Sequence, residues 1–155
     1  MTQNKEMRFF NRIYFYAVAL ICLVAGGCNK SDQGGASPTM AATINGSNIT
    51  FTTILTSSNG LTVVQGTSSR YTLTIYLKTI SSSIFTLADP STGYYATVAD
   101  ALGSNYSTDP VNTGQITLTT NGLKFNGTFY FIANETSPSP GGGNINVSNG
   151  SCTNI

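Results

Sequence analysis

The sequence contains no histidine and no tryptophan, and only 8% of its residues are charged. Without histidine, the chain cannot form the Ser-His or Cys-His pairs that activate a nucleophile, nor a zinc site with imidazole ligands. The Ser-x-x-Lys spacing of serine–lysine acyl-transfer enzymes is also absent. Because these absences remove the commonest hydrolytic mechanisms, we expect a protein that is not an enzyme.

The few carboxylates occur where turns are expected. Asp89 and Asp109 each precede a proline, a position at which aspartate commonly starts a turn, and Asp100 and Glu135 lie near predicted loops. A glycosidase would need two facing carboxylates with separated pKa values. A calcium site built from Asp100, Asp109 and backbone oxygens is conceivable, because Ca²⁺ takes oxygen ligands, but no loop spacing supports it. We therefore expect no cofactor and no metal.

Charge of either sign is scarce in residues 28–155, which carry four basic and five acidic side chains and a formal charge of −1. No basic patch exists, so the electrostatic signature of nucleic-acid binding is missing. Charged residues normally make up about a quarter of a soluble chain. Serine, threonine, asparagine and glycine must therefore provide most of the polar surface.

The N-terminus has the pattern of a bacterial lipoprotein signal. Three basic residues, Lys5, Arg8 and Arg12, precede an apolar run at 13–24, and small residues at 25–27 lead directly into Cys28. This order is typical of a secretory signal peptide, and the run is too short for a spanning helix, which needs about 20 apolar residues. The junction resembles the bacterial lipobox. We expect residues 1–27 to be removed and Cys28 to carry the lipid anchor.

The chain contains three cysteines, and two of them are accounted for by this processing. Cys22 leaves with the signal peptide, and the lipid occupies the sulfur of Cys28. Cys152 is then without a partner; it is either a reactive thiol or a small apolar side chain, and free cysteine is usually buried. We favour a buried Cys152. The polar residues 28–39 predict a lipidated flexible linker, followed by a single all-β domain at 40–155.

Short alternating segments separated by turn residues predict an all-β fold. In one of these segments, Leu73 and Ile75 point to one side and Thr72 and Thr74 to the other, the period of a half-buried strand. Repeated Asn-Gly pairs mark the turns, and 98–114 is predicted as the longest loop. We expect an antiparallel β-sandwich of roughly eight strands, with a small β-barrel as the alternative. The predicted strands are 40–45, 49–53, 61–65, 70–78, 83–87, 93–97, 115–133 (a hairpin), 144–148 and 151–155.

The hairpin at 115–133 is the strongest of these predictions. Its turn is assigned to Asn121-Gly122, because type I′ turns require a positive φ at both central residues. That turn places Leu118 opposite Phe125 and Ile116 opposite Gly127. The residues Leu123, Phe125, Gly127, Phe129, Phe131 and Ala133 would then share one face, with Tyr130 on the other.

Three motifs resemble a group of small Bacteroidota lipoproteins: Ala42–Gly46, the glycine-then-aromatic segment Phe125–Phe131, and the ending Asn149–Ile155. The resemblance covers nearly all of 40–155, and the single β domain of that group has no established function. It implies a lipid-anchored protein of the cell envelope, at the outer membrane on its periplasmic or external side. Lys30-Ser31-Asp32 looks like the short charged tags that send some of these lipoproteins to the cell surface.

The function that fits these observations is a non-catalytic binding or accessory module at the cell envelope. One alternative is a surface glycan-binding module that uses Tyr94, Tyr95 and Tyr106, which lie around the predicted long loop and combine an apolar ring with a polar tip. Some of these tyrosines could instead alternate into the core. The other alternative is a structural subunit of an outer-membrane complex, which would show an exposed apolar patch. An envelope protein or a glycan is the expected partner, besides the membrane itself.

Overall fold

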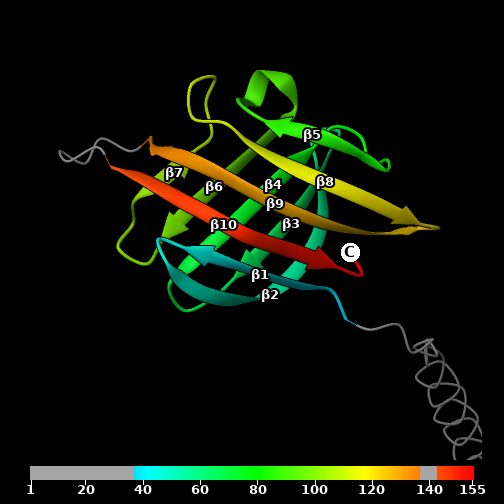
Figure 1. Ribbon diagram of the computed structural model, residues 1–155, viewed down its shortest axis with the longest axis horizontal. Helices are drawn as coiled ribbons and strands as arrows, with labels where there is room; N and C mark the ends of the chain where they lie inside the picture. Colours follow the sequence, from blue (N-terminus) through cyan, green and yellow to red (C-terminus); the bar gives the residue numbers. More distant parts are fainter. Residues whose placement is uncertain (1–36, 137–142) are drawn as a thin grey trace, which may run out of the picture. The chain divides into compact units, whose positions relative to one another are not determined.

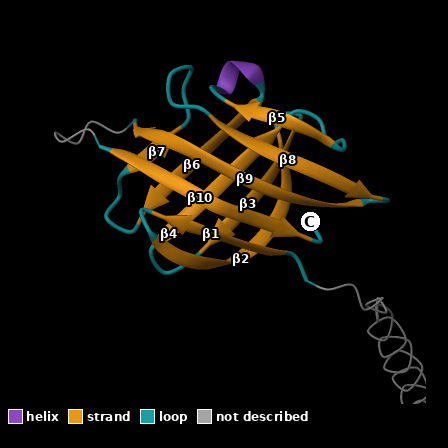
Figure 2. Ribbon diagram, viewed as in Figure 1, coloured by secondary structure: helices purple, strands orange, loops and turns teal. Residues whose placement is uncertain are grey.

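The computed structural model describes residues 37–136 and 143–155; the predicted signal peptide, Cys28 and most of the predicted linker lie outside them. The described residues form antiparallel strands and one short 3₁₀ helix (Figure 2). The elements are β1 (Thr39–Ile44), β2 (Ser47–Ser58), β3 (Leu61–Thr67), β4 (Tyr71–Leu77), β5 (Ser83–Leu87), η1 (Pro90–Thr92), β6 (Tyr94–Asp100), β7 (Asn105–Ser107), β8 (Gly114–Asn121), β9 (Lys124–Glu135) and β10 (Asn144–Thr153). None of the described residues form a helix that is long and apolar enough to cross a membrane.

The sheet closes on itself through β9. One edge of β9 pairs with β10, and the other pairs with β8 along Lys124–Phe131 and with β7 at Asn134–Glu135. The order β10-β1-β2-β3-β4-β6-β7-β9 is thus a ring of eight strands, and β8 and β5 continue the sheet beyond β9 at the top of Figure 1. The prediction of an all-β fold is confirmed, and the architecture is the one given as the alternative, a small β-barrel. The sandwich was wrong, because the pairing of β9 with both β10 and β7 closes the strands into one ring and leaves no two separate sheets to face each other.

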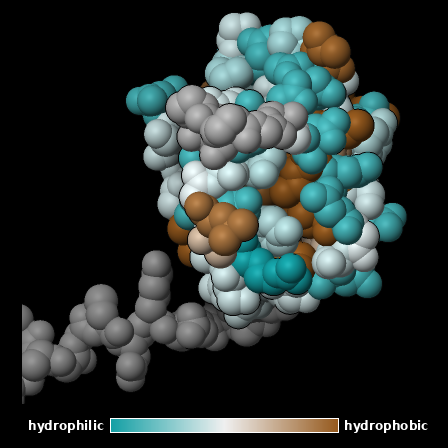
Figure 3. Space-filling model, turned by 90° about the vertical axis from the view of Figure 1, so that its left-hand side faces the viewer, coloured by the Kyte–Doolittle hydropathy of each residue, from teal (hydrophilic) through white to brown (hydrophobic). Residues whose placement is uncertain are grey.

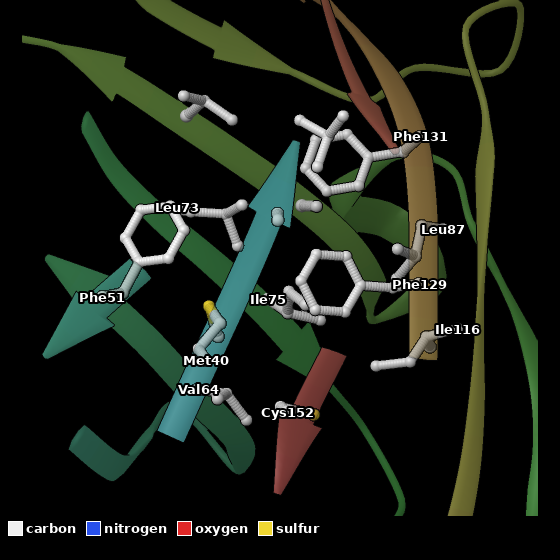
Figure 4. Packing of buried hydrophobic residues seen from close by; sticks show 14 of the residues in the cluster. Met40, Phe51, Val64, Leu73, Ile75, Leu87, Ile116, Phe129, Phe131 and Cys152 are labelled. Atoms are coloured by element: carbon white, nitrogen blue, oxygen red, sulfur yellow. The ribbon is translucent and has the colours of Figure 1, made fainter. Parts of the chain in front are cut away.

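Side chains from all around the ring fill the interior. Phe129 and Phe131 point inward from β9, with ring centroids 6.4 Å apart, toward Leu73 and Ile75 of β4 (Figure 4). Burying one such side chain contributes about 1.5–3 kcal/mol. The chain's last residue also joins the barrel: Ile155 is buried and exchanges backbone hydrogen bonds with Phe125, at 2.9 and 3.1 Å. The core therefore uses both ends of the domain.

The β8–β9 hairpin keeps its predicted faces but not its predicted turn. Leu118 pairs with Gly127 and Asn121 with Lys124, so the turn residues are Gly122 and Leu123. Gly122 alone has a positive φ, +63°, the pattern of a type II′ turn. Because the register changes by two residues, an even number, the side chains of β9 that were predicted to face the interior still do so. Leu123, however, is fully exposed in the turn, so its assignment to the apolar face was wrong.

The reason for the shift lies in the packing of Gly127. A Cβ on this glycine would lie 2.8 Å from Leu118 Cδ2 and 3.1 Å from the Cys152 sulfur. The missing side chain lets both neighbours pack against the strand. By contrast, Asn45-Gly46 and Asn59-Gly60 form the expected two-residue turns, with a positive φ at every central residue.

Two other sequence predictions need correction. The predicted strands 144–148 and 151–155 are one strand, β10, because Asn149-Gly150 forms a β-bulge rather than a turn. The predicted loop 98–114 contains the three-residue strand β7, which is too short to show an alternating pattern. It pairs with β6 and β9 and closes the ring.

Candidate functional site

The three tyrosines predicted as ligand contacts do not come together. Tyr94 and Tyr106 pair with Leu77 and Val98, so they share the inner face and pack, half-buried, against the core. Tyr94 also stacks on Phe85, at 4.8 Å between ring centroids, and its hydroxyl hydrogen-bonds with a threonine of the β4–β5 connection.

Tyr95 lies on the opposite side of β6, facing outward. It pairs with Tyr76 of β4, and the two rings stack at 4.1 Å between centroids with an interplanar angle of 4°. Partial burial raises the pKa of Tyr95, and the neighbouring Tyr76 adds to the rise. Each ring thus covers one face of the other, which leaves less aromatic surface for a ligand.

The predicted turn carboxylates do serve turns. Asp89 accepts the Ser91 N–H at 2.8 Å at the start of η1, and Asp100 accepts the N–H groups of Leu102 and Ser104 at 2.9 Å. These hydrogen bonds account for both carboxylates as turn-stabilising groups. The described residues include no group of three or more side chains able to hold a metal ion.

Asp109 has the fullest set of partners. Its carboxylate accepts backbone N–H groups from Asn112 at 2.6 Å and Val111 at 2.8 Å, and the side-chain amide of Asn134 at 2.7 Å. These donors, the Asn112 N–H first, hold the pKa of Asp109 below its usual value, although some desolvation opposes them. Asn134 belongs to β9, so this hydrogen bond fixes the loop before β8 to the barrel.

Cys152 is buried against the core, as the sequence predicted. Burial raises the pKa of its thiol to about 12, and a hydrogen bond from the Gly127 backbone only partly offsets this. The thiolate is the reactive form of cysteine. At neutral pH, Cys152 is therefore an apolar core residue and not a nucleophile.

A groove of about 700 Å³ lies on the outer face of β8, β9 and β10. Its outward-facing side chains carry hydroxyl, amide, aliphatic and phenol groups, and none of them is a charged residue. The lining residues are Thr113, Gln115, Thr117, Thr128, Phe129, Tyr130, Phe131, Ile132, Asn146, Val147, Ser148, Asn149, Gly150 and Ser151. Sequence reasoning had placed Tyr130 on the outer face but had not predicted a site there.

The bulge in β10 shapes this groove. Val147 pairs with Phe131 and Gly150 with Phe129, so two residues of β10, Ser148 and Asn149, oppose Tyr130 alone. Asn149 takes a left-handed φ of +49°, which places the extra residue at this point. Bulges redirect side chains and occur often beside binding sites. The one sequence signal for the site was an Asn-Gly pair within an alternating strand.

Gly150 is essential to the floor of the groove. A Cβ at this position would lie only 2.2–2.6 Å from three ring atoms of Phe129. The glycine therefore allows the Phe129 ring to lie directly beneath the bulge. The core and the groove are joined at this contact.

The groove offers two kinds of interaction to a ligand. Tyr130 is 55% exposed and Ile132 is 37% exposed, so the site has an apolar centre. Around them, Gln115 pairs with Tyr130 and Asn146 with Ile132, which places amide groups on both sides. Figure 3 shows another side of the domain, where hydrophobic patches lie among hydrophilic residues.

No curated protein and no solved structure matches the chain. A family model does match, over residues 37–155, which include every described residue of the barrel. The family is described as a domain of unknown function, which agrees with the resemblance to a group whose β domain has no established function. That the chain is a lipoprotein remains a prediction. The chain belongs to the DUF6252 family, a domain of unknown function.

Proposed function

We propose that the protein is a lipid-anchored, non-catalytic module of the cell envelope that binds uncharged carbohydrate in the groove of β8, β9 and β10. The observation that carries this proposal is the exposed Tyr130 among uncharged hydrogen-bonding side chains. The proposal is binding and not catalysis, because the lining of the groove offers no carboxylate, imidazole or thiol for acid–base or nucleophilic chemistry.

The chemistry of a sugar matches these side chains. One face of a pyranose carries C–H groups that can pack on an aromatic ring, and its hydroxyls donate and accept hydrogen bonds. Tyr130 supplies the ring, while Gln115 and Asn146 supply amides with both donors and acceptors. An anionic ligand would need a cation to offset its desolvation, and the lining has none. The groove therefore favours neutral sugars over phosphorylated or acidic ones.

The sequence supports the place of action. The signal pattern of 1–27 and the lipobox-like junction at Cys28 favour a lipid anchor. Two or more acyl chains hold a protein stably on a membrane, whereas one does not. The eleven residues 29–39 would reach at most about 35–40 Å, which keeps the barrel close to the leaflet. Replacing Cys28 with Ser should move the protein into the soluble fraction; unchanged membrane retention would contradict the anchor.

A glycan array probed with the detergent-solubilised full chain tests the binding function. We expect neutral glycans to bind, and Tyr130→Ala to weaken the binding about tenfold, equivalent to about 1.4 kcal/mol for a lost stacking contact. The matched control is Tyr95→Ala, which removes an outward tyrosine outside the groove. If Tyr95→Ala abolished binding and Tyr130→Ala did not, the site would lie on β4 and β6. Selective binding of acidic glycans would also contradict the proposal.

A further inference from the structure

Strand β2 extends beyond the strand beside it. Its pairing with β1 ends at Thr52, opposite Thr39, while its pairing with β3 continues to Ser58. The segment Thr53–Ser58 is therefore paired along one edge. Across 37–136 and 143–155, no strand pairs with its other edge. We call this edge of Thr53–Ser58 the free edge.

The turn before β2 determines which backbone groups point to the free edge. In a two-residue hairpin the residues flanking the turn form a hydrogen-bonded pair, here Ile44 and Ser47. Bonding residues then alternate along the strand, so the odd-numbered residues of β2 direct their N–H and C=O groups toward β1. Thr53, Leu55 and Ser57 present these groups to the free edge.

Pro38 explains why β1 does not cover the free edge. In the observed register, the next residue of β1 to bond with β2 after Met40 would be Pro38, opposite Thr53. Proline has no backbone N–H and cannot make this bond. The pairing of β1 with β2 therefore stops at Thr39.

The free edge lacks the usual protection against another strand. Natural edges carry lysine, proline or inward-pointing charges, but Thr53–Ser58 contains none of these. Two aliphatic side chains lie open on it: Ile54 is 49% exposed on the outer face and Leu55 is 46% exposed on the inner face. The other end of β2, before Thr52, is also unpaired on its β3 side. There, however, Phe51 is buried and Ile49 packs against the core.

We propose that the free edge pairs with the same segment of a second copy of this chain, around a two-fold axis at Leu55. Antiparallel pairing in this register places Leu55 opposite the partner's Leu55 and Thr53 opposite the partner's Ser57. All of these residues direct backbone groups to the edge, so three hydrogen-bonded pairs form. Inner-face residues meet inner-face residues, as a continuous sheet requires.

A second copy satisfies every condition that the free edge sets for its occupant. The occupant must be extended and uncharged, must offer free N–H and C=O groups on alternate residues, and must place an apolar side chain opposite Leu55. The free edge has each of these properties itself. The interface is short, so we expect a dimer that depends on concentration. The inference depends neither on the groove nor on the lipid anchor.

Disulfide trapping in the full chain tests the register. Opposed residues of a hydrogen-bonded antiparallel pair have Cα atoms about 5.5 Å apart, a separation that suits a disulfide. We expect Leu55→Cys to give a covalent dimer on a non-reducing gel. The control is Thr117→Cys, which is exposed on β8 but paired on both edges, and it should not form the dimer. Mixing Ile54→Cys with Thr56→Cys should also give a covalent dimer, because these residues oppose each other. Equal crosslinking of Leu55→Cys and Thr117→Cys would overturn the proposal.

Sedimentation of the detergent-solubilised full chain tests the interface without a new thiol. We expect the mass to rise to that of a dimer with concentration, and Leu55→Lys to keep the protein monomeric by opposing two charges at the axis. Leu55 is nearly half exposed, so this change should leave the fold intact, which circular dichroism will verify. A monomer at every concentration would overturn the proposal, as would a dimer that Leu55→Lys leaves unchanged.

Discussion

The two faces of β9 place very different demands on their side chains. On the inner face, Phe129 and Phe131 are 3% and 1% exposed and fill the barrel. On the outer face, Tyr130 and Ile132 are 55% and 37% exposed and lie in a groove among hydroxyl and amide groups. A single alternating strand thus supplies both the stability of the fold and the candidate binding surface. The two roles can be changed separately, except where Gly150 joins them.

The largest expected effect comes from the inner face. Phe131→Ala should lower the free energy of unfolding by about 3–5 kcal/mol, because it leaves a cavity in the centre of the core. Tyr130→Ala, one residue away on the exposed face, should cost far less. Urea midpoints measure both. If Tyr130→Ala were the more damaging, the assignment of the two faces would be wrong.

Gly150→Ala should produce the next largest effect, because its new Cβ would overlap the Phe129 ring. Overpacking of this kind costs about 1–3 kcal/mol. The double variant Gly150→Ala with Phe129→Leu sharpens the test. We expect its loss of stability to be smaller than the sum of the two single losses, since the smaller side chain leaves room for the methyl group. Additive losses would show that the clash is relieved elsewhere.

The pH dependence of stability should reveal the burial of Cys152. Its thiol has a pKa of about 12 in the folded protein, above the ordinary value of 9.0. The folded state therefore holds this proton where the unfolded state releases it. The contribution is complete below pH 9 and is lost between pH 9 and 12, at up to about 1.4 kcal/mol per pH unit. Cys152→Ala should flatten this part of the profile; an unchanged slope would place the effect on other groups.

The smallest effect is expected at Leu123. It is fully exposed in the β8–β9 turn, so Leu123→Thr should change the free energy of unfolding by less than about 0.5 kcal/mol. The matched comparison is Phe125→Thr, two residues along the chain on the buried face, which should be severely destabilising. A large loss from Leu123→Thr would restore the register in which Leu123 belongs to the inner face.

Local patterns predicted the parts of this fold that depend on local chemistry. The alternation of β9 assigned Phe129, Tyr130 and Phe131 to their correct faces, because a period of two is a property of any strand. The turn at Gly122-Leu123 was missed because the packing of Leu118 on Gly127 decides it across two strands. Such a contact leaves no mark in a short stretch of sequence.

Features that depend on distant strands were harder to predict. Closure of the barrel rests on β9 pairing with both β10 and the short strand β7, whose three residues are too few to show a pattern. The groove rests on an extra residue in β10 relative to its neighbours, which only their register reveals. The tyrosines at 94, 95 and 106 were close in sequence, but alternation along β6 divides Tyr94 from Tyr95.

The position of β10 has a consequence for the order in which the protein can form. Strand β10 joins β1 to β9, and Thr39 and Thr153 meet across 114 residues of sequence. Until β10 has been made, β1 and β9 each lack this neighbour. Pairings between such distant segments form slowly, because a long loop must close first. A chain interrupted before β10 would therefore remain an open sheet, and the barrel closes only once β10 has been made.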